Sequence, residues 1–181
     1  MTNDFSVGAN KTVNVNGILN LAGKIISGSG NFILNASSSI KLGENSSLTT
    51  AVTTGTVAFN SGANYFFDGT TVAQNTSLVP SGLTGNITIS NPLGVTLSQS
   101  LKVNLTSTLL VTSSGKLLFG DGTNLSAILS GTGNFNAQSG STLVITSADG
   151  ICTSTTSGNI RNSGTRTFSS CLLYTSDAAD E

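Results

Sequence analysis

Ser-Gly-Ser-Gly-Asn-Phe at residues 27–32 returns as Ser-Gly-Thr-Gly-Asn-Phe at residues 130–135, 103 residues further along the chain. The correspondence continues beyond the hexapeptide, because Ile40 aligns with Leu143 and Leu48 aligns with Ile151. Apolar positions match, while the Ser, Thr and Asn residues around them vary. A chain that repeats its buried positions rather than a set of reactive groups is typical of a scaffold built from stacked units.

Two further matches show that the spacing of this repeat is not constant. Gly17–Ala22 matches Gly115–Gly120 at an offset of 98, and Thr54–Phe59 matches Ser163–Phe168 at an offset of 109. The extra residues fall in stretches rich in Thr, Ser and Asn. A solenoid absorbs such insertions at its corners without disturbing neighbouring coils, so the varying offset favours a solenoid.

The composition of the 181-residue chain favours a folded β protein. Hydrophobic residues make up 37% of the chain and charged residues only 8%, and His and Trp are absent. Disordered segments usually combine high net charge with few apolar residues, which is the opposite pattern. No basic patch is present to neutralise phosphates, so nucleic acid is not an expected partner. No apolar run approaches the ~18 residues of a membrane span.

Short alternating runs of apolar and polar residues indicate strands rather than helices. They occur at residues 12–16, 86–90, 95–98 and 142–146, and clusters of Gly, Ser and Asn that signal turns lie between them. No 11-residue window carries a sustained apolar stripe with helical spacing. The sequence therefore predicts an all-β fold.

Among all-β folds, a parallel β-helix or β-solenoid agrees best with the repeat. The abundant Asn residues of the turns also suit stacked coils, because Asn side chains can form hydrogen bonds from one coil to the next. An antiparallel β-sandwich remains the alternative, because Asn16-Gly17 and the Asp-Gly pairs at Asp68, Asp121 and Asp149 are typical of hairpins.

We interpret residues 1–170 as one β-solenoid fragment with an internal repeat of about 100 residues. One copy covers 7–60 and the other covers 106–170, and a linker segment, 60–104, lies between them. Pro80 and Pro92 both fall in this linker, and we expect them at corners or at an edge because proline cannot donate a ladder hydrogen bond.

The last eleven residues, 171–181, differ from the rest of the chain and hold three of its eight acidic residues. This segment resembles the in-frame translation of a transposon-based sequencing-library adaptor. We therefore expect 171–181 to be a non-native tail, and we expect the natural protein to continue beyond Ser170.

An aromatic cluster in the linker gives the one candidate binding site. Tyr65, Phe66 and Phe67 are followed directly by Asp68. The simplest interpretation is that these rings cap the core at a bend. The functional hypothesis is a platform for a sugar ring formed by Tyr65, Phe66 and Asp68, which requires exposed rings.

The sequence offers little chemistry for catalysis, so we expect no enzyme, no cofactor and no metal site. Without His, the usual general base near neutral pH is missing. Outside the tail the acidic residues are Asp4, Glu44, Asp68, Asp121 and Asp149, which we interpret mainly as solvated turn residues. Cys152 is the single cysteine outside the tail, and with no His as a partner we interpret it as a strand residue rather than a nucleophile.

Residues 5–170 resemble the Gly/Ser/Thr/Asn-rich repeats of large secreted bacterial surface proteins, which are adhesin-like β-solenoids akin to autotransporter passenger and haemagglutinin-type repeats. The closest phrases are Phe5–Ala9, Val13–Gly17, Ser27–Phe32 and Ser163–Phe168. They resemble repeats of Bacteroidota surface proteins exported by the type IX route.

The resemblance implies an extracellular or bacterial cell-surface location, with a signal peptide upstream of Met1. It also implies a structural or adhesive role, as a stalk or surface-binding scaffold. The expected partners are glycans, cell surfaces and neighbouring repeats of the same protein. A carbohydrate-binding module and a carbohydrate-active β-helix enzyme remain the alternatives.

Overall fold

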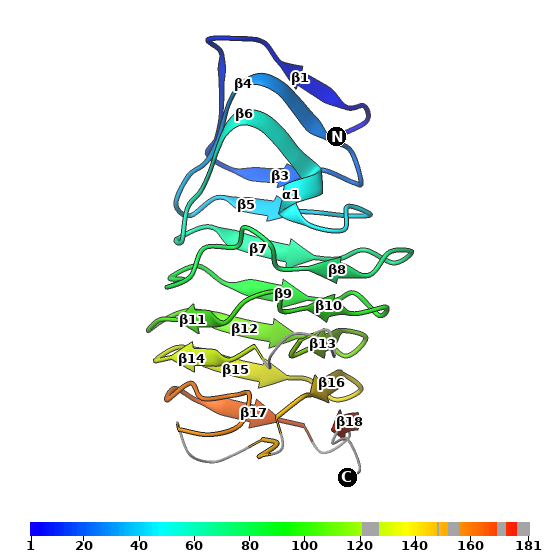
Figure 1. Ribbon diagram of the computed structural model, residues 1–181, viewed down its shortest axis with the longest axis vertical. Coiled ribbons are helices and arrows are strands. Elements are labelled where there is room, and N and C mark those ends of the chain that lie inside the picture. Colours follow the sequence, from blue (N-terminus) through cyan, green and yellow to red (C-terminus); the bar gives the residue numbers. More distant parts are fainter. Residues whose placement is uncertain (121–126, 148, 152–155, 170–172, 177–181) are drawn as a thin grey trace.

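A computed structural model describes residues 1–120, 127–147, 149–151, 156–169 and 173–176. The chain winds into a parallel β-solenoid whose coils stack in sequence order from the N-terminal to the C-terminal end (Figure 1). Every pair of neighbouring strands among these residues is parallel, for example β12 with β15. The predicted solenoid is thereby confirmed, and the antiparallel sandwich is not what the chain forms.

The longest sheet runs along the whole stack and receives one strand from each coil. Partnered residues lie 21 residues apart between Ile18 and Ser39 and 31 residues apart between Phe135 and Arg166, so the coils vary in length. This seven-stranded sheet consists of β3 (Ile18–Asn20), β5 (Ser39–Lys41), β7 (Asn64–Phe67), β9 (Ile87–Ile89), β12 (Thr108–Val111), β15 (Asn134–Ala137) and β17 (Arg166–Phe168).

Three smaller sheets form the other faces of the solenoid. The four-stranded N-terminal sheet contains β1 (Phe5–Val7), β2 (Thr12–Val15), β4 (Ile26–Leu34) and β6 (Val52–Phe59), and the short helix α1 (Leu48–Ala51) leads into β6. The five-stranded sheet contains β8 (Gln74–Asn75), β10 (Val95–Thr96), β13 (Lys116–Leu118), β16 (Thr142–Ile145) and β18 (Leu173–Ser176). The remaining pair is β11 (Leu101–Val103) with β14 (Leu129–Gly131).

The core is a continuous column of side chains along the solenoid axis. On the seven-stranded sheet, Ile40, Tyr65, Ile87, Leu109 and Phe135 are neighbours in register, and each is fully buried. Because successive residues of a strand point to opposite faces, the residue next to each of these in its own strand points outward toward solvent. Each coil therefore covers the apolar side chains of the coil before it, which is why an isolated coil would have no core.

Asparagine side chains join successive coils at the corners, as the composition predicts. Asn35 donates to the side-chain oxygen of Asn16 at 2.8 Å. Asn104 donates to the carbonyl of Gly82 at 2.9 Å in another part of the stack. The first bond links two side chains across coils, and the second satisfies a corner carbonyl that no sheet ladder reaches.

The repeated hexapeptide builds the same kind of corner in both places. Gly28 and Gly131 have φ angles of 114° and 101°, a region that favours glycine. A Cβ at Gly28 would lie 2.3 Å from the carbonyl oxygen of Val7, and one at Gly131 would lie 2.0 Å from that of Val103. The repeat therefore encodes a close approach of the chain to the preceding coil.

The two hexapeptides nevertheless lead into different faces of the solenoid. Phe32 pairs with Val13 and Val57 in the N-terminal sheet, whereas Phe135 pairs with Leu109 in the seven-stranded sheet. The match at offset 98 shows the same displacement, since it relates β3 of the seven-stranded sheet to β13 of the five-stranded sheet. Matching residues of the 103-residue repeat therefore lie four coils apart along the axis and on neighbouring faces of the solenoid.

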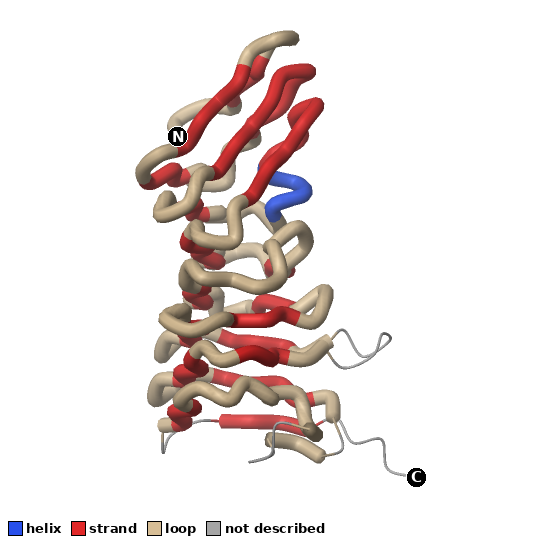
Figure 2. Tube along the Cα trace, turned by 90° about the vertical axis from the view of Figure 1, so that its left-hand side faces the viewer, coloured by secondary structure: helices blue, strands red, loops and turns tan. Residues whose placement is uncertain are grey.

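This displacement arises between β7 and β9. The third coil contains β6 before β7, but the chain between β8 and β9 forms only an isolated bridge at Leu83. The long strands β4 and β6 lie at the N-terminal end of the stack, and Figure 2 shows that they slant away from the compact coils that follow. Pro80 and Pro92 both lie outside the strands, as predicted for residues that cannot donate a ladder bond.

Strand β18, at the C-terminal end, lies within the predicted non-native tail and pairs with β16. The tail residues 171–172 and 177–181 lie outside the described residues. No helix in the part of the chain that the structure describes is long and apolar enough to cross a membrane.

Candidate functional site: the outer groove of the seven-stranded sheet

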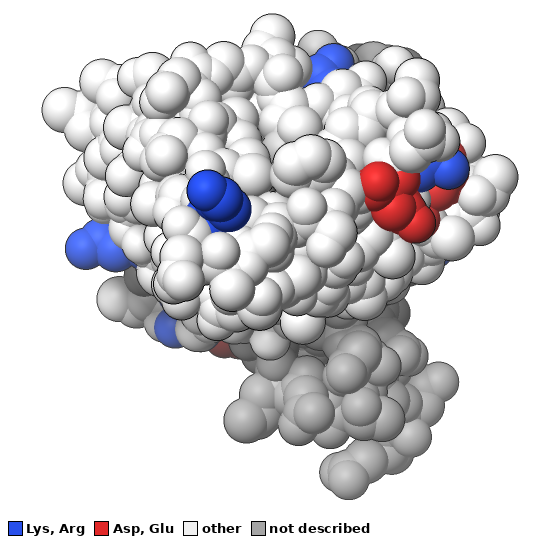
Figure 3. All heavy atoms as spheres, turned by 90° about the horizontal axis from the view of Figure 1, so that it is seen from above, with Lys and Arg blue, Asp and Glu red and all other residues white. Residues whose placement is uncertain are grey.

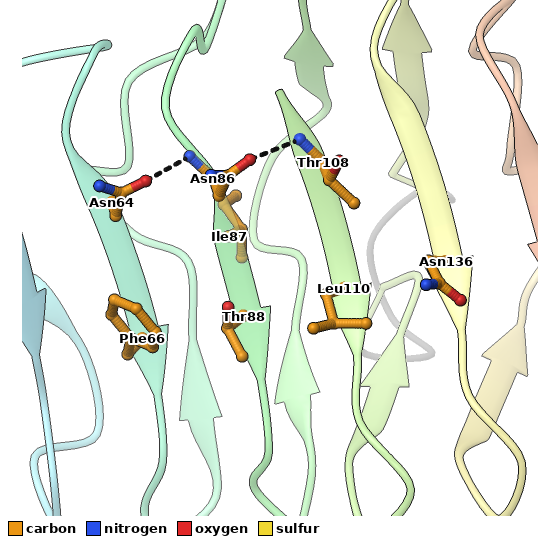
Figure 4. A pocket seen from close by; sticks show the side chains of 8 residues that line it. All are labelled: Asn64, Phe66, Asn86, Ile87, Thr88, Thr108, Leu110 and Asn136. Carbon is orange, nitrogen blue, oxygen red and sulfur yellow. Dashed lines mark hydrogen bonds between the residues drawn. The ribbon is translucent and has the colours of Figure 1, made fainter. Parts of the chain in front are cut away.

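A shallow, open groove of about 300 Å³ lies on the outer face of the seven-stranded sheet (Figure 4). It crosses β7, β9, β12 and β15, so four successive coils contribute to it. The residues that line it, called the outer groove below, are Asn64, Phe66, Asn86, Ile87, Thr88, Thr108, Leu110 and Asn136.

Strand alternation places one row of side chains along the floor of the outer groove. Phe66 is in register with Thr88, Thr88 with Leu110, and Leu110 with Asn136. The flanking positions of each strand point inward and are buried in the core. An aromatic ring, a hydroxyl, an aliphatic chain and an amide therefore succeed one another along the axis.

A ladder of asparagine side chains forms one wall of the outer groove and fixes the spacing of its strands. The backbone N–H of Asn86 donates to the side-chain oxygen of Asn64 at 3.0 Å, and the backbone N–H of Thr108 donates to that of Asn86 at 2.9 Å. Figure 4 shows these two bonds in sequence along the wall. The backbone N–H at the start of the following strand would otherwise lack a partner, and the amide oxygen accepts its hydrogen bond.

Some polar groups of the outer groove have no partner in the protein. Among the described residues, the side chains of Asn136 and Thr88 form no hydrogen bond, and both are partly exposed. An amide offers two donors and one acceptor oxygen, and a hydroxyl both donates and accepts. The outer groove therefore presents free hydrogen-bonding groups beside the partly exposed ring of Phe66.

The outer groove is electrically neutral apart from one flanking cation. None of its eight lining residues is titratable, and the ammonium of Lys41 lies 5.1 Å from the centroid of the Phe66 ring. A cation at this distance is attracted to the face of the ring and helps to fix it. Charges are also sparse when the molecule is viewed along its axis (Figure 3). The lining thus suits an uncharged ligand rich in hydroxyl groups and provides no general acid or base.

The three residues of the predicted sugar platform do not form one surface. Phe66 lines the outer groove, but Tyr65 points inward and is fully buried. The Tyr65 hydroxyl donates to the carbonyl of Asn60 at 2.6 Å, and burial raises the pKa of this hydroxyl. Asp68 accepts a bond from the backbone N–H of Gly43 at 2.8 Å, which ties two coils together. The alternation of the strand separates Tyr65 from Phe66, so a platform containing both rings is wrong.

The acidic side chains Asp4 and Glu44 likewise serve the corners. Asp4 accepts from the backbone N–H of Ile25 at 2.9 Å. Glu44 accepts the backbone N–H groups of Thr70 and Thr71, each at 2.9 Å, and also both of their hydroxyls. Hydrogen bonds led by the Thr71 hydroxyl and the Thr70 backbone stabilise the charged form and lower the pKa of Glu44 to about 2. Glu44 therefore joins the second coil to the third.

No group of three or more His, Cys, Asp or Glu side chains that could hold a metal ion occurs among the residues the structure describes. Asp121 and Cys152, which the sequence singled out, lie outside the described residues.

The sequence interpretation missed Asn64, Asn86, Thr108 and Asn136. Asn64, Asn86 and Thr108 share a signal, because a polar residue followed by apolar, variable and apolar positions recurs every 22 residues from Asn64 to Asn86 and again to Thr108. Asn136 lies outside this pattern, since its partner Leu110 is 26 residues earlier. This 22-residue period is shorter than the 103-residue repeat, and its copies share fewer identical residues. It is nevertheless the true length of a coil in this region.

The fold defines this chain as a parallel β-solenoid with a neutral outer groove. Comparison with protein-family models, with curated proteins and with solved structures gave no match for this chain.

Proposed function

We propose that this chain is a structural and adhesive segment of an exported cell-surface repeat protein. The observation that carries the proposal is the column of fully buried residues that runs from Ile40 on β5 to Phe135 on β15 and joins successive coils along the seven-stranded sheet. A stack of this kind grows in length without changing its cross-section, because each coil contacts only its neighbours. It is suited to hold other parts of a protein at a distance from a surface.

The adhesive part of the proposal rests on the outer groove. Its free groups on Asn136 and Thr88 and its partly exposed Phe66 ring match the two features of a neutral glycan, hydroxyl groups and an apolar ring face. Because the lining carries no charge, binding should depend only weakly on salt. The proposed ligand class is therefore a neutral polysaccharide of a cell or matrix surface.

Binding of the purified chain to a panel of immobilised neutral polysaccharides tests the adhesive role. We expect Phe66→Ala to weaken binding about fivefold, since removal of a stacking ring costs on the order of 1 kcal/mol. Phe5→Ala is the matched control, because Phe5 is a phenylalanine with 49% of its surface exposed on β1, away from the outer groove. Equal loss in both variants, or no binding by the unmodified chain, would contradict a site at the outer groove.

The proposed surface location has its own test. An antibody raised against the purified chain should label intact cells of the organism that encodes it. Labelling that requires permeabilised cells would contradict export.

A further inference from the structure

Strand β6 ends the N-terminal sheet in the middle of the chain. It pairs with β4 on one side, and no backbone hydrogen bond joins Thr53–Phe59 to a following coil within the described residues. The N–H of Asn60 donates to Leu34 in the preceding coil at 3.2 Å. Since backbone groups alternate in direction along a parallel strand, those of Val57 and Phe59 face the opposite, unpaired side.

The core is also incomplete beside β6. Val57 and Phe59 are in register with Phe32 and Leu34, which are fully buried, yet both are only partly buried themselves. The same partial burial occurs at Val13, in the first coil of the stack. Strand β6 lies in the interior of the stack, yet it is covered as poorly as a terminal strand. It is therefore an edge, because the sheet ends on this face while further strands follow on the other faces (Figures 1 and 2).

Nothing in the sequence of β6 protects this edge. Natural sheets usually block their edges with charged residues, proline or a very short strand. Strand β6 has eight residues, Val-Thr-Thr-Gly-Thr-Val-Ala-Phe, with no charge and no proline. Such a strand is suited to pair with another uncharged strand.

The burial pattern of β6 identifies which strand fits. Side chains of Val52, Thr54, Val57 and Phe59 lie on the more buried face, and those of the other four residues are exposed. This pattern is symmetric about the point between Gly55 and Thr56. An antiparallel copy of the same strand therefore places inward residues opposite inward residues, which a two-fold interface requires.

We propose that two copies of this chain associate by antiparallel pairing of their β6 strands about that point. Val52 then lies opposite the partner's Phe59, and Thr54 lies opposite the partner's Val57. Both pairs join β-branched or aromatic side chains that stabilise cross-strand contacts. The pairing completes the free ladder and covers Val57 and Phe59, and no charged residue of β6 opposes it. This association is independent of the proposed adhesive role.

Light scattering coupled to size-exclusion chromatography tests the proposal over a range of protein concentrations. We expect a concentration-dependent dimer of the unmodified chain. Thr56→Lys should weaken the dimer about tenfold or more, because it brings two like charges together beside the two-fold axis. Thr56 is exposed, so the substitution leaves the fold of each copy intact.

Thr12→Lys is the matched control, because Thr12, Asn31 and Thr56 form one row in register and Thr12 is the exposed residue at the opposite end of that row. It should leave the dimer unchanged, and a mixture of Thr56→Lys with Thr56→Glu should restore the dimer. A monomer at all concentrations, or a dimer that Thr12→Lys disrupts and Thr56→Lys does not, would overturn the proposal.

Discussion

At the scale of single residues, polar side chains hold the corners of this solenoid by accepting backbone hydrogen bonds from a neighbouring coil. Asn64, Asn86 and Glu44 accept from the coil that follows. Asp68 accepts from Gly43 in the coil before it. The amide and carboxylate oxygens thus perform the same structural task. The low charge of the chain follows, since most of these positions need an acceptor rather than a charge.

Glu44 gives a prediction about pH. Because its pKa falls from 4.5 to about 2 in the folded chain, its contribution to stability is complete above pH 4.5 and is lost as the pH falls toward 2. Glu44→Gln should therefore melt at a lower temperature than the unmodified chain at pH 7, and the difference should shrink between pH 4.5 and 2. Thermal unfolding followed by circular dichroism measures both.

Asp149→Asn is the control for this measurement. It removes the same charge from an exposed turn residue whose carboxylate forms no hydrogen bond in the described part of the chain. A difference at pH 7 that persists unchanged at pH 2 would contradict the assigned role of Glu44.

At the scale of elements, the repeated hexapeptide marks a glycine bend, which lies within β4 in the first copy and between β14 and β15 in the second. Gly131→Ala should destabilise the chain by at least ~2 kcal/mol, because the added methyl group meets the Val103 carbonyl at 2.0 Å and φ is 101°. Gly17→Ala is the control, since nothing lies within 4 Å of its Cβ position and its φ is not positive. Urea unfolding that ranks the two variants equally would contradict this role of the corner.

The sequence predicted the class of these elements but not their assignment to faces. Alternation in residues 86–90 and 142–146 predicted β9 and β16 because alternating burial is a local property. The face on which a strand lies depends instead on how many residues each corner uses, which local patterns do not record. For this reason the sequence does not predict the displacement between β7 and β9, even though the 103-residue repeat spans it.

The outer groove was predictable only in part. The aromatic cluster in the sequence predicts Phe66, but it predicts Tyr65 equally, although alternation along the strand places the two rings on opposite faces. The asparagines of the outer groove were missed because Asn is common throughout the chain. Only the stacking of coils distinguishes Asn64 and Asn136 from other corner asparagines.

At the scale of the whole molecule, the chain is a column of coils in which each coil contacts its neighbours. Stability is then a sum of similar local contributions rather than the property of one closed core. Within the described residues, the N-terminal coil and the edge at β6 are covered on one side only. A protein built in this way can be lengthened, displaced by one face or interrupted without loss of the general fold.

Single-molecule stretching between the two ends tests whether the chain is a stack of coils that are each held by their neighbours. We predict that coils detach one after another, each releasing about 70 to 110 Å of chain, since coils of 21 to 31 residues extend by ~3.5 Å per residue. A single event that releases the whole chain at once, with no intermediate lengths, would contradict the account.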